Sequence, residues 1–233
     1  MKRLIVGFII GLGSLLGFAE TSNAQQSPVT AIDIALEPDE TMIQHAQAVN
    51  AQLRKNYPKG FALDASHRPH ITILQRYVRS VDLDNVYAAV DKVLEKEKVD
   101  SWQLKAFEYD FIPFKGIGIA GIGIQPTDNL LRLQQELIDA VAPFTEETGT
   151  AAAFVTTPED SEINQPTIDY VAAFVPRSTG QHFVPHVTVG VATQLYLEEM
   201  LAEPFEAFTF SPTSASVYQL GNFGTARKKL KSF

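Results

Sequence analysis

The feature that most constrains the fold is a short phrase that the chain writes twice. Residues 68–73 read RPHITI and residues 184–189 read VPHVTV. Only five histidines occur in the 233 residues, and two of them occupy the same place in this phrase. Side chains of a strand alternate between its two faces, so each phrase predicts a strand with a histidine and a threonine on one face and β-branched residues on the other.

The elements around the two phrases follow the same order. The first half predicts a strand over residues 31–36, a helix opening at 38–40, the first histidine strand, a helix over about 82–96 and a strand over 102–111. The second half predicts a strand over 116–124, a helix capped by Thr127, the second histidine strand, a helix over about 194–201 and strands over 205–210 and 215–220. This repeated order predicts an α+β fold with an internal pseudo-two-fold.

The N-terminus predicts an export signal. A basic start, an apolar run over residues 4–18 and small residues before Gln25 are typical of a cleaved signal peptide over residues 1–24. We therefore expect a periplasmic or secreted protein, with no membrane segment after cleavage. Residues 25–233 are expected to form one bilobed domain, with lobes over about 28–112 and 113–233. Residues 145–184 are longer than an ordinary connection and are interpreted as a flap or specificity loop.

Composition excludes several classes of protein. Cysteine is absent, which excludes disulfides, a thiol nucleophile and cysteine-based metal sites. The net charge of −8 disfavours long nucleic acid as a partner, although a small anion in a locally positive site remains compatible. We expect a monomer that binds a small phosphodiester or nucleotide.

The paired side chains suit the cleavage of a phosphodiester. Facing strands would surround one small group with two imidazoles, His70 and His186, and two hydroxyls, Thr72 and Thr188. An imidazole with a pKa near ~6.5 can take or give a proton at working pH, so one histidine would accept a proton and the other would protonate the leaving oxygen. The threonine hydroxyls would donate to the non-bridging oxygens of the phosphate. Neither step needs a metal or another cofactor.

Two H-x-T-x phrases, one in each half, resemble the two-histidine (2H) phosphoesterase superfamily. The phrases are His70-Ile71-Thr72-Ile73 and His186-Val187-Thr188-Val189, and they are most similar to those of the bacterial 2'-5' RNA ligase and cyclic phosphodiesterase branch. The resemblance covers essentially all of residues 25–233. It implies a bilobed α+β fold, with two antiparallel sheets lining a central cleft and helices outside. It also implies metal-independent chemistry on 2',3'-cyclic phosphates or 2'-5' linkages.

The chain departs from that pattern after the second phrase. Some members of the superfamily place an arginine there to hold phosphate, whereas this chain continues with Gly190 and Val191. A cation must therefore come from elsewhere, and aromatic side chains could stack on a base, although aromatic residues on strands are more often core. The candidate substrate contacts are Arg76, Lys115, Arg227, Tyr77, Tyr109 and Tyr218.

Other interpretations of the same residues stay open. His67 with His70, and His182 with His186, have spacings that a turn could convert into a metal site, which would favour a metal-dependent hydrolase. The same site could also bind a phosphorylated ligand without turnover. Residues 116–121 match the glycine pattern of dinucleotide-binding loops, but the glycines alternate with isoleucines inside a strand pattern, and a shift of parity predicts a bulge at Ala120-Gly121.

Overall fold

The computed structural model describes residues 28–65, 67–158 and 160–233. The expected signal peptide over residues 1–24 lies outside the described residues. Within the described part of the chain, no helix is long and apolar enough to cross a membrane.

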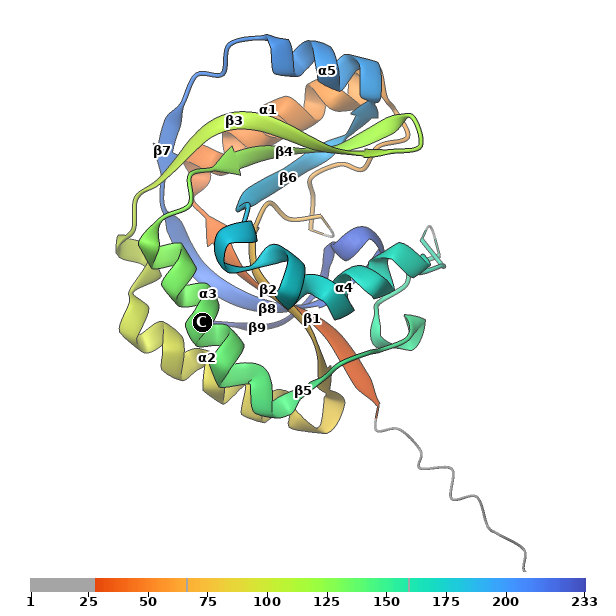
Figure 1. The fold of residues 1–233 in the computed structure, drawn as a ribbon. Coiled ribbons are helices and arrows are strands. Elements are labelled where there is room, and N and C mark those ends of the chain that lie inside the picture. The colour runs from red at the N-terminus through yellow and green to blue at the C-terminus, as the bar shows by residue number, and fades with distance from the viewer. Residues whose placement is uncertain (1–27, 66, 159) are drawn as a thin grey trace, which may run out of the picture.

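Nine strands of the described residues form one antiparallel sheet with two halves. The first half has the order β2-β1-β8-β9, and the second has the order β7-β3-β4-β6, with the short β5 beside β2. The strands span β1 Val29–Pro38, β2 Ile71–Arg79, β3 Leu104–Phe114, β4 Ile117–Ile124, β5 Thr145–Glu146, β6 His186–Thr193, β7 Phe208–Phe210, β8 Pro212–Leu220 and β9 Ala226–Ser232. The halves meet where β2 pairs with β6 through Ile71 and Val187. The sheet curls strongly around this junction (Figure 1).

The helices cover the outer faces of the two halves. They span α1 Glu40–Asn56, α2 Leu83–Glu97, α3 Asp128–Val141, α4 Gln165–Ser178 and α5 Gln194–Ala202. In Figure 1, α1 and α5 cover the half that contains β3, β4 and β6, while α2 and α3 cover the other half. The predicted α+β class with antiparallel sheets and outer helices is confirmed, and the two expected sheets are joined into one.

Apolar stripes and caps explain these helices. The stripe of α1, which includes Met42 and Leu53, is fully buried, and Asp39 caps the helix by accepting from the Met42 amide. Thr127 caps α3 in the same way by accepting from the Leu130 amide at 3.2 Å, as the sequence predicts.

The connections exchange strands and helices between the two halves. Strand β3 pairs with β4 and β7, while β8 and β9 return to pair beside β1. Helix α1 follows β1 but packs on β6, and α3 follows β4 but packs on β2. Each half of the sheet therefore contains strands from both of the expected lobes, residues 28–112 and residues 113–233.

The segment over residues 145–184 is more ordered than a loop. It contains α4, a 14-residue helix capped by Asn164, which accepts from the Thr167 amide at 2.9 Å. Helix α4 packs on β2, where the Ile168 carbonyl accepts from the Tyr77 hydroxyl at 3.0 Å.

Candidate functional site

The two histidine phrases alternate as the sequence predicts. Their β-branched residues, Ile71, Ile73, Val187 and Val189, are fully buried. Their histidines and threonines are half-buried on the opposite side of the sheet, which we call the histidine face. The alternation therefore gives each strand one core face and one face that a ligand can reach.

The junction between the halves brings the two phrases side by side. Ile71 pairs with Val187 in an antiparallel register. One residue to either side, that register sets His70 toward Thr188 and Thr72 toward His186. Four polar groups of the histidine face thus surround the only residue pair that joins β2 to β6 among the described residues.

Each imidazole is oriented by a hydrogen bond to the carbonyl two residues before it in the chain. The Nδ1 of His70 donates to the Arg68 carbonyl at 2.7 Å, and the Nδ1 of His186 donates to the Val184 carbonyl at 2.9 Å. A carbonyl can only accept, so Nδ1 carries a proton in both rings. In each neutral ring, Nε2 is therefore the nitrogen that can take up or release a proton.

A β-bulge ends each phrase. Thr72 pairs with Ala35 and Leu74 with Ile34, which leaves Ile73 as an extra residue in β2. In β6 the register shift opposite Ala120 and Gly121 leaves Val189 as the extra residue. The register shift lies at Ala120 and Gly121, where the sequence predicts a bulge, but the extra residue belongs to β6 and β4 itself alternates without a break.

A buried side-chain amide holds each bulge. Gln134 of α3 donates to the Ile73 carbonyl at 2.9 Å, and Asn50 of α1 donates to the Val189 carbonyl at 2.8 Å. Both amides are at least 95% buried. The exchanged helices thus fix the backbone that carries the histidines and threonines.

The glycine pattern over residues 116–121 serves the site through packing. It lies in the turn before β4 and in β4 itself, and no helix follows it directly. A Cβ on Gly121 would lie 3.3 Å from the His186 ring carbon Cδ2. Glycine therefore leaves room for the imidazole, which agrees with the prediction that this is no dinucleotide-binding loop.

Asp33 is a site residue that the sequence analysis did not single out. It lies on β1, opposite Gln75 of β2, and is completely buried. Its Oδ2 accepts from the Thr72 hydroxyl at 2.8 Å and from the Gln75 amide at 3.3 Å, and lies 3.4 Å from His70 Nε2. Its Oδ1 has no hydrogen-bond partner among the described residues. Two hydrogen-bond donors and the Nε2 of His70 therefore converge on one buried carboxylate oxygen.

Asp33 changes the proton affinity of His70. Burial alone would lower the pKa of His70, because it disfavours the charged ring. The hydrogen bond and the charge of Asp33, together with the Arg68 carbonyl and the charge of Glu37, outweigh burial and raise that pKa. The His70 side of the site thus favours a protonated imidazole.

A second polar cluster lies beside His70. The ring of Tyr218 is centred 6.2 Å from the His70 ring, and its hydroxyl donates to Glu37 at 2.7 Å. Glu37 also accepts from Ser216 at 2.6 Å and forms an ion pair with Lys229. The predicted contact Tyr218 is thus next to the site, but it is buried and its hydroxyl is engaged.

The bulge at Ile73 turns Arg76 away from the site, and burial under α4 keeps Tyr77 from it. Beyond the bulge, Gln75 and Tyr77 follow Thr72 on the histidine face, and Arg76 points to the other side, where it donates to the Thr145 hydroxyl at 3.0 Å. Tyr77 is buried beneath α4, and burial raises its pKa to about 12. The structure therefore does not bring Arg76 or Tyr77 to the histidines.

The remaining candidates, Lys115, Arg227 and Tyr109, contact groups other than the two histidines and threonines. Lys115 is in the β3–β4 turn, with its Nζ 5.3 Å from the centre of the Phe114 ring. Arg227 is nearly buried in an ion pair with Asp160 at 3.2 Å. Tyr109 packs edge-on against Phe205, on the face of β3 opposite the histidine face.

The additional histidines of the pairs with metal-like spacing, His67 and His182, make other contacts in the structure. The ring of His67 stacks on Phe61, while His182 is exposed and contacts Gln181. Across residues 28–233, with 66 and 159 left aside, no group of three or more His, Cys, Asp or Glu side chains could hold a metal ion.

Comparison with known proteins finds proteins of similar structure but none of matching sequence. No family model and no curated protein matches the sequence. TT0787 of Thermus thermophilus is similar in structure with a TM-score of 0.52 and 14% identity, over 88% of this chain and 97% of TT0787. E. coli LigT complexed with 3'-AMP has a TM-score of 0.44 and 14% identity, over 89% of this chain and 98% of LigT. Apo LigT has a TM-score of 0.42 and 12% identity over the same shares. The similarity to TT0787 shows that this chain shares the fold of that protein.

Proposed function

We propose that this protein is a two-histidine phosphoesterase that cleaves a small 2',3'-cyclic phosphate or 2'-5' phosphodiester without a metal. The observation that carries the proposal is the junction at Ile71 and Val187, where two histidine–threonine pairs adjoin on one face. The fold implied by the family resemblance is also the fold observed.

In the proposed reaction the two Nε2 atoms exchange protons with the substrate. One histidine removes a proton from water or from a ribose hydroxyl, and the other protonates the leaving oxygen. A substrate oxygen near Thr72 would replace Asp33 as the acceptor of the Thr72 hydroxyl, while Thr188 would donate from the other strand. Because each Nδ1 is already fixed by a carbonyl, the rings need little reorganisation to act.

Export from the cytoplasm is part of the proposal. It depends on the sequence pattern of residues 1–24 alone. Secretion of the full-length protein from an expression host, with the mature N-terminus sequenced, tests it. An N-terminus at Gln25 is expected, and retention of residues 1–24 would contradict it.

The activity is tested with the purified protein in the presence of EDTA. Nucleoside 2',3'-cyclic phosphates and 2'-5' dinucleotides are offered to the wild type, His70→Ala, His186→Ala and the control His182→Ala, which removes an exposed histidine outside the phrases. We expect turnover that survives EDTA, falls by at least ~100-fold in each of the first two variants and is unchanged in the control. Silencing by EDTA would favour a metal-dependent hydrolase. Tight binding without turnover that persists in both variants would favour a binding module.

A further inference from the structure

The register of β3, β4 and β6 arranges the histidine face of one half in rows. Directly opposite residues of antiparallel strands share a face of the sheet. The β4 partners of His186 and Thr188, and the β3 partners of those residues, therefore lie on the histidine face. The rows are Glu108–Gly123–His186, Asp110–Gly121–Thr188, Ile112–Ile119–Val191 and Phe114–Ile117–Thr193.

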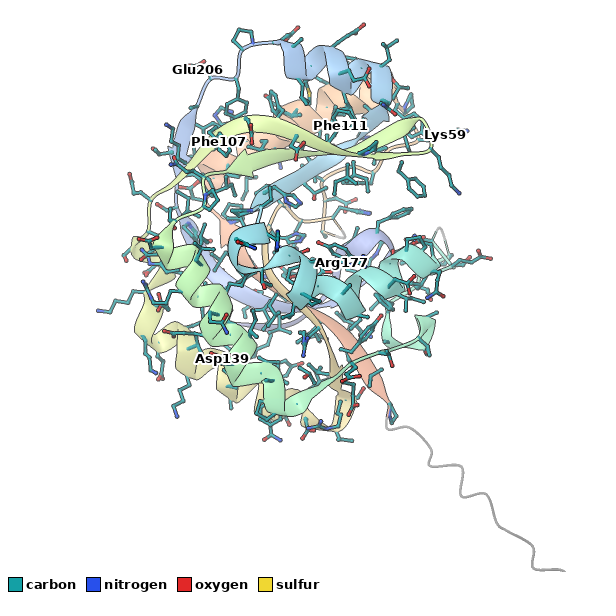
Figure 2. All side chains as sticks on the ribbon, viewed as in Figure 1. Lys59, Phe107, Phe111, Asp139, Arg177 and Glu206 are labelled. Atoms are coloured by element: carbon teal, nitrogen blue, oxygen red, sulfur yellow. The ribbon has the colours of Figure 1, made fainter. Side chains whose placement is uncertain are left out.

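In the last two rows, the residues of β3 and β4 are apolar and accessible. Ile112 is 59% exposed, and Phe114, Ile117 and Ile119 are half-buried. Successive rows lie ~7 Å apart along a strand, so the apolar rows begin about one step beyond Thr188. We call these four residues the apolar shelf. Aromatic residues of the other face, such as Phe111 (Figure 2), instead pack toward α5, where Phe111 and Leu197 close over Gly118.

Phe223 faces the shelf from the other half of the sheet. It lies in the short helix η6, Asn222–Gly224, with a φ of 56°, and its side chain is 51% exposed. Its ring meets that of Phe114 edge-on, with centres 5.6 Å apart. A bulky residue at positive φ is an uncommon and strained conformation that the surrounding structure must impose.

Buried hydrogen bonds impose this conformation. The Phe223 amide donates to the Thr167 hydroxyl at 2.9 Å, and the Asn222 side chain accepts from the amide and the side chain of Asn164 at 3.1 and 2.6 Å. Helix α4 and its cap thus hold an exposed ring in a fixed position. A ring that costs strain and remains accessible is a candidate ligand contact.

Helix η6 also adjoins the His70 side of the site. The Gln75 amide donates both to Asp33 Oδ2 at 3.3 Å and to the Gly224 carbonyl at 3.4 Å. The shelf extends from His186 and Thr188, while η6 is tied to the residues around His70. The two rings meet beside a pocket of about 340 Å³ whose walls include Asp160, Asn164 and Asn222.

We propose that Phe223 and the apolar shelf form a subsite for the base of a nucleotide substrate. This inference rests on the proposed function and names the substrate class as nucleoside phosphodiesters rather than base-free ones. A base is planar and stacks on aromatic side chains, and its exocyclic amino groups can donate to a carboxylate of the pocket wall such as that of the exposed Glu162. The row of Ile112 and Ile119 lies between the row of Thr188 and that of Phe114, so the ribose would lie over this row, between the phosphate and the base.

The test compares a nucleoside 2',3'-cyclic phosphate with 1-O-methylribose 2',3'-cyclic phosphate, which lacks a base. The variants are Phe223→Gly, which removes the ring and suits the positive φ, Phe223→Tyr, which keeps the ring, and the control Val81→Ala at an exposed site on another element. We expect Phe223→Gly to lower kcat/KM for the nucleotide by about 5- to 150-fold. The base-free substrate, Phe223→Tyr and the control should stay within about twofold of the wild type.

The possible results separate this inference from the proposed function. If the wild type cleaves both substrates and Phe223→Gly affects them equally or not at all, the base subsite is overturned while the activity stands. If no substrate is cleaved, the activity fails, and titration of a nucleoside 2'-monophosphate against ribose 5-phosphate by NMR tests the subsite alone. Preferential, Phe223-dependent binding of the nucleotide supports the inference, and equal affinities overturn it. A dimer that Phe223→Gly dissociates, without an effect on the nucleotide, would assign the shelf to a second copy and also overturn it.

Discussion

Replacing Asp33 with asparagine should change the pH dependence of the site more than its shape. Asparagine keeps an oxygen that can accept from Thr72 and Gln75, but it removes the negative charge 3.4 Å from His70 Nε2. The charged groups that act on His70 are Asp33 and Glu37 of β1, and Asp33 is the stronger. The pKa of His70 should therefore fall in the Asp33→Asn variant.

The size of the effect follows from the separation and the burial of the pair. At 3.4 Å and an effective dielectric constant of about 20, Coulomb's law gives an attraction of roughly 5 kcal/mol between two unit charges. Burial of the ring opposes protonation, and only 13% of the His70 side chain is exposed. Each unit of pKa corresponds to about 1.36 kcal/mol, so loss of the charge should be large enough to measure in a titration.

Two measurements report the change. NMR titration of the His70 Cε1 proton gives the pKa directly, and the pH profile of kcat/KM shows which limb depends on His70. If His70 is the general acid, the alkaline limb moves to lower pH in Asp33→Asn; if it is the general base, the acid limb does so. The limb that belongs to His186 should stay in place.

The control is Glu37→Gln, which removes the charge with the weaker effect on His70. It should move the His70 titration in the same direction by a smaller amount. The reasoning would be refuted if His70 titrated at the same or a higher pH in Asp33→Asn than in the wild type. That result can be obtained from NMR alone, even without a substrate.

Two further predictions concern stability. Asn50→Leu and Gln134→Leu should each lower the free energy of unfolding by about 2–5 kcal/mol in urea denaturation, because each leaves buried backbone groups without partners. The control Gln135→Ala, on the exposed face of α3, should change the free energy of unfolding by less than ~0.5 kcal/mol. A similar loss of stability in all three variants would contradict the argument. Because the pKa of His70 is raised above its ordinary value of 6.5 in the folded protein, its contribution to stability is complete below about pH 6.5 and is lost as the pH rises through the folded-state pKa. The difference in stability between wild type and Asp33→Asn should therefore shrink as the pH rises over that window, and a difference that grew with pH would show the opposite sign of coupling.

Local patterns in the sequence predict the helices and strands well, because each such pattern depends on a few neighbouring residues. The stripes of α1 and α3, the cap at Thr127 and the alternation in the two phrases follow directly from spacing and side-chain type. The sequence placed the register shift at Ala120 and Gly121 correctly, but the parity change in β4 has another origin: Ile117 and Ile119 lie on the histidine face, and Ile122 and Ile124 lie on the opposite face of an unbroken strand.

The features of the site that the sequence did not predict depend on interactions between segments far apart in the chain. The bulge at Ile73 turns Arg76 away from the histidines, and nothing in the alternation of residues 70–73 signals it. The exchange of helices between halves, which brings Gln134 to β2 and Asn50 to β6, is also a property of the whole fold. A signal for Asp33 did exist, because a single acid inside an apolar strand pattern is costly to bury unless it has partners.

The two halves share a backbone plan but carry side chains of different chemistry at an equivalent position beside the site. Thr72 pairs with Ala35 and Thr188 pairs with Gly121, and two residues earlier β1 has Asp33 where β4 has Ile119. One half thus places beside its histidine a carboxylate that raises the pKa of the ring, and the other begins the apolar shelf. If these roles are separate, Asp33→Asn should leave the preference for a nucleotide over the base-free substrate unchanged, and Phe223→Gly should leave both limbs of the pH profile in place. The changes in activation free energy calculated from kcat/KM should then add in the double variant within about 0.5 kcal/mol. A larger coupling energy would mean that binding of the base and protonation of His70 depend on one another.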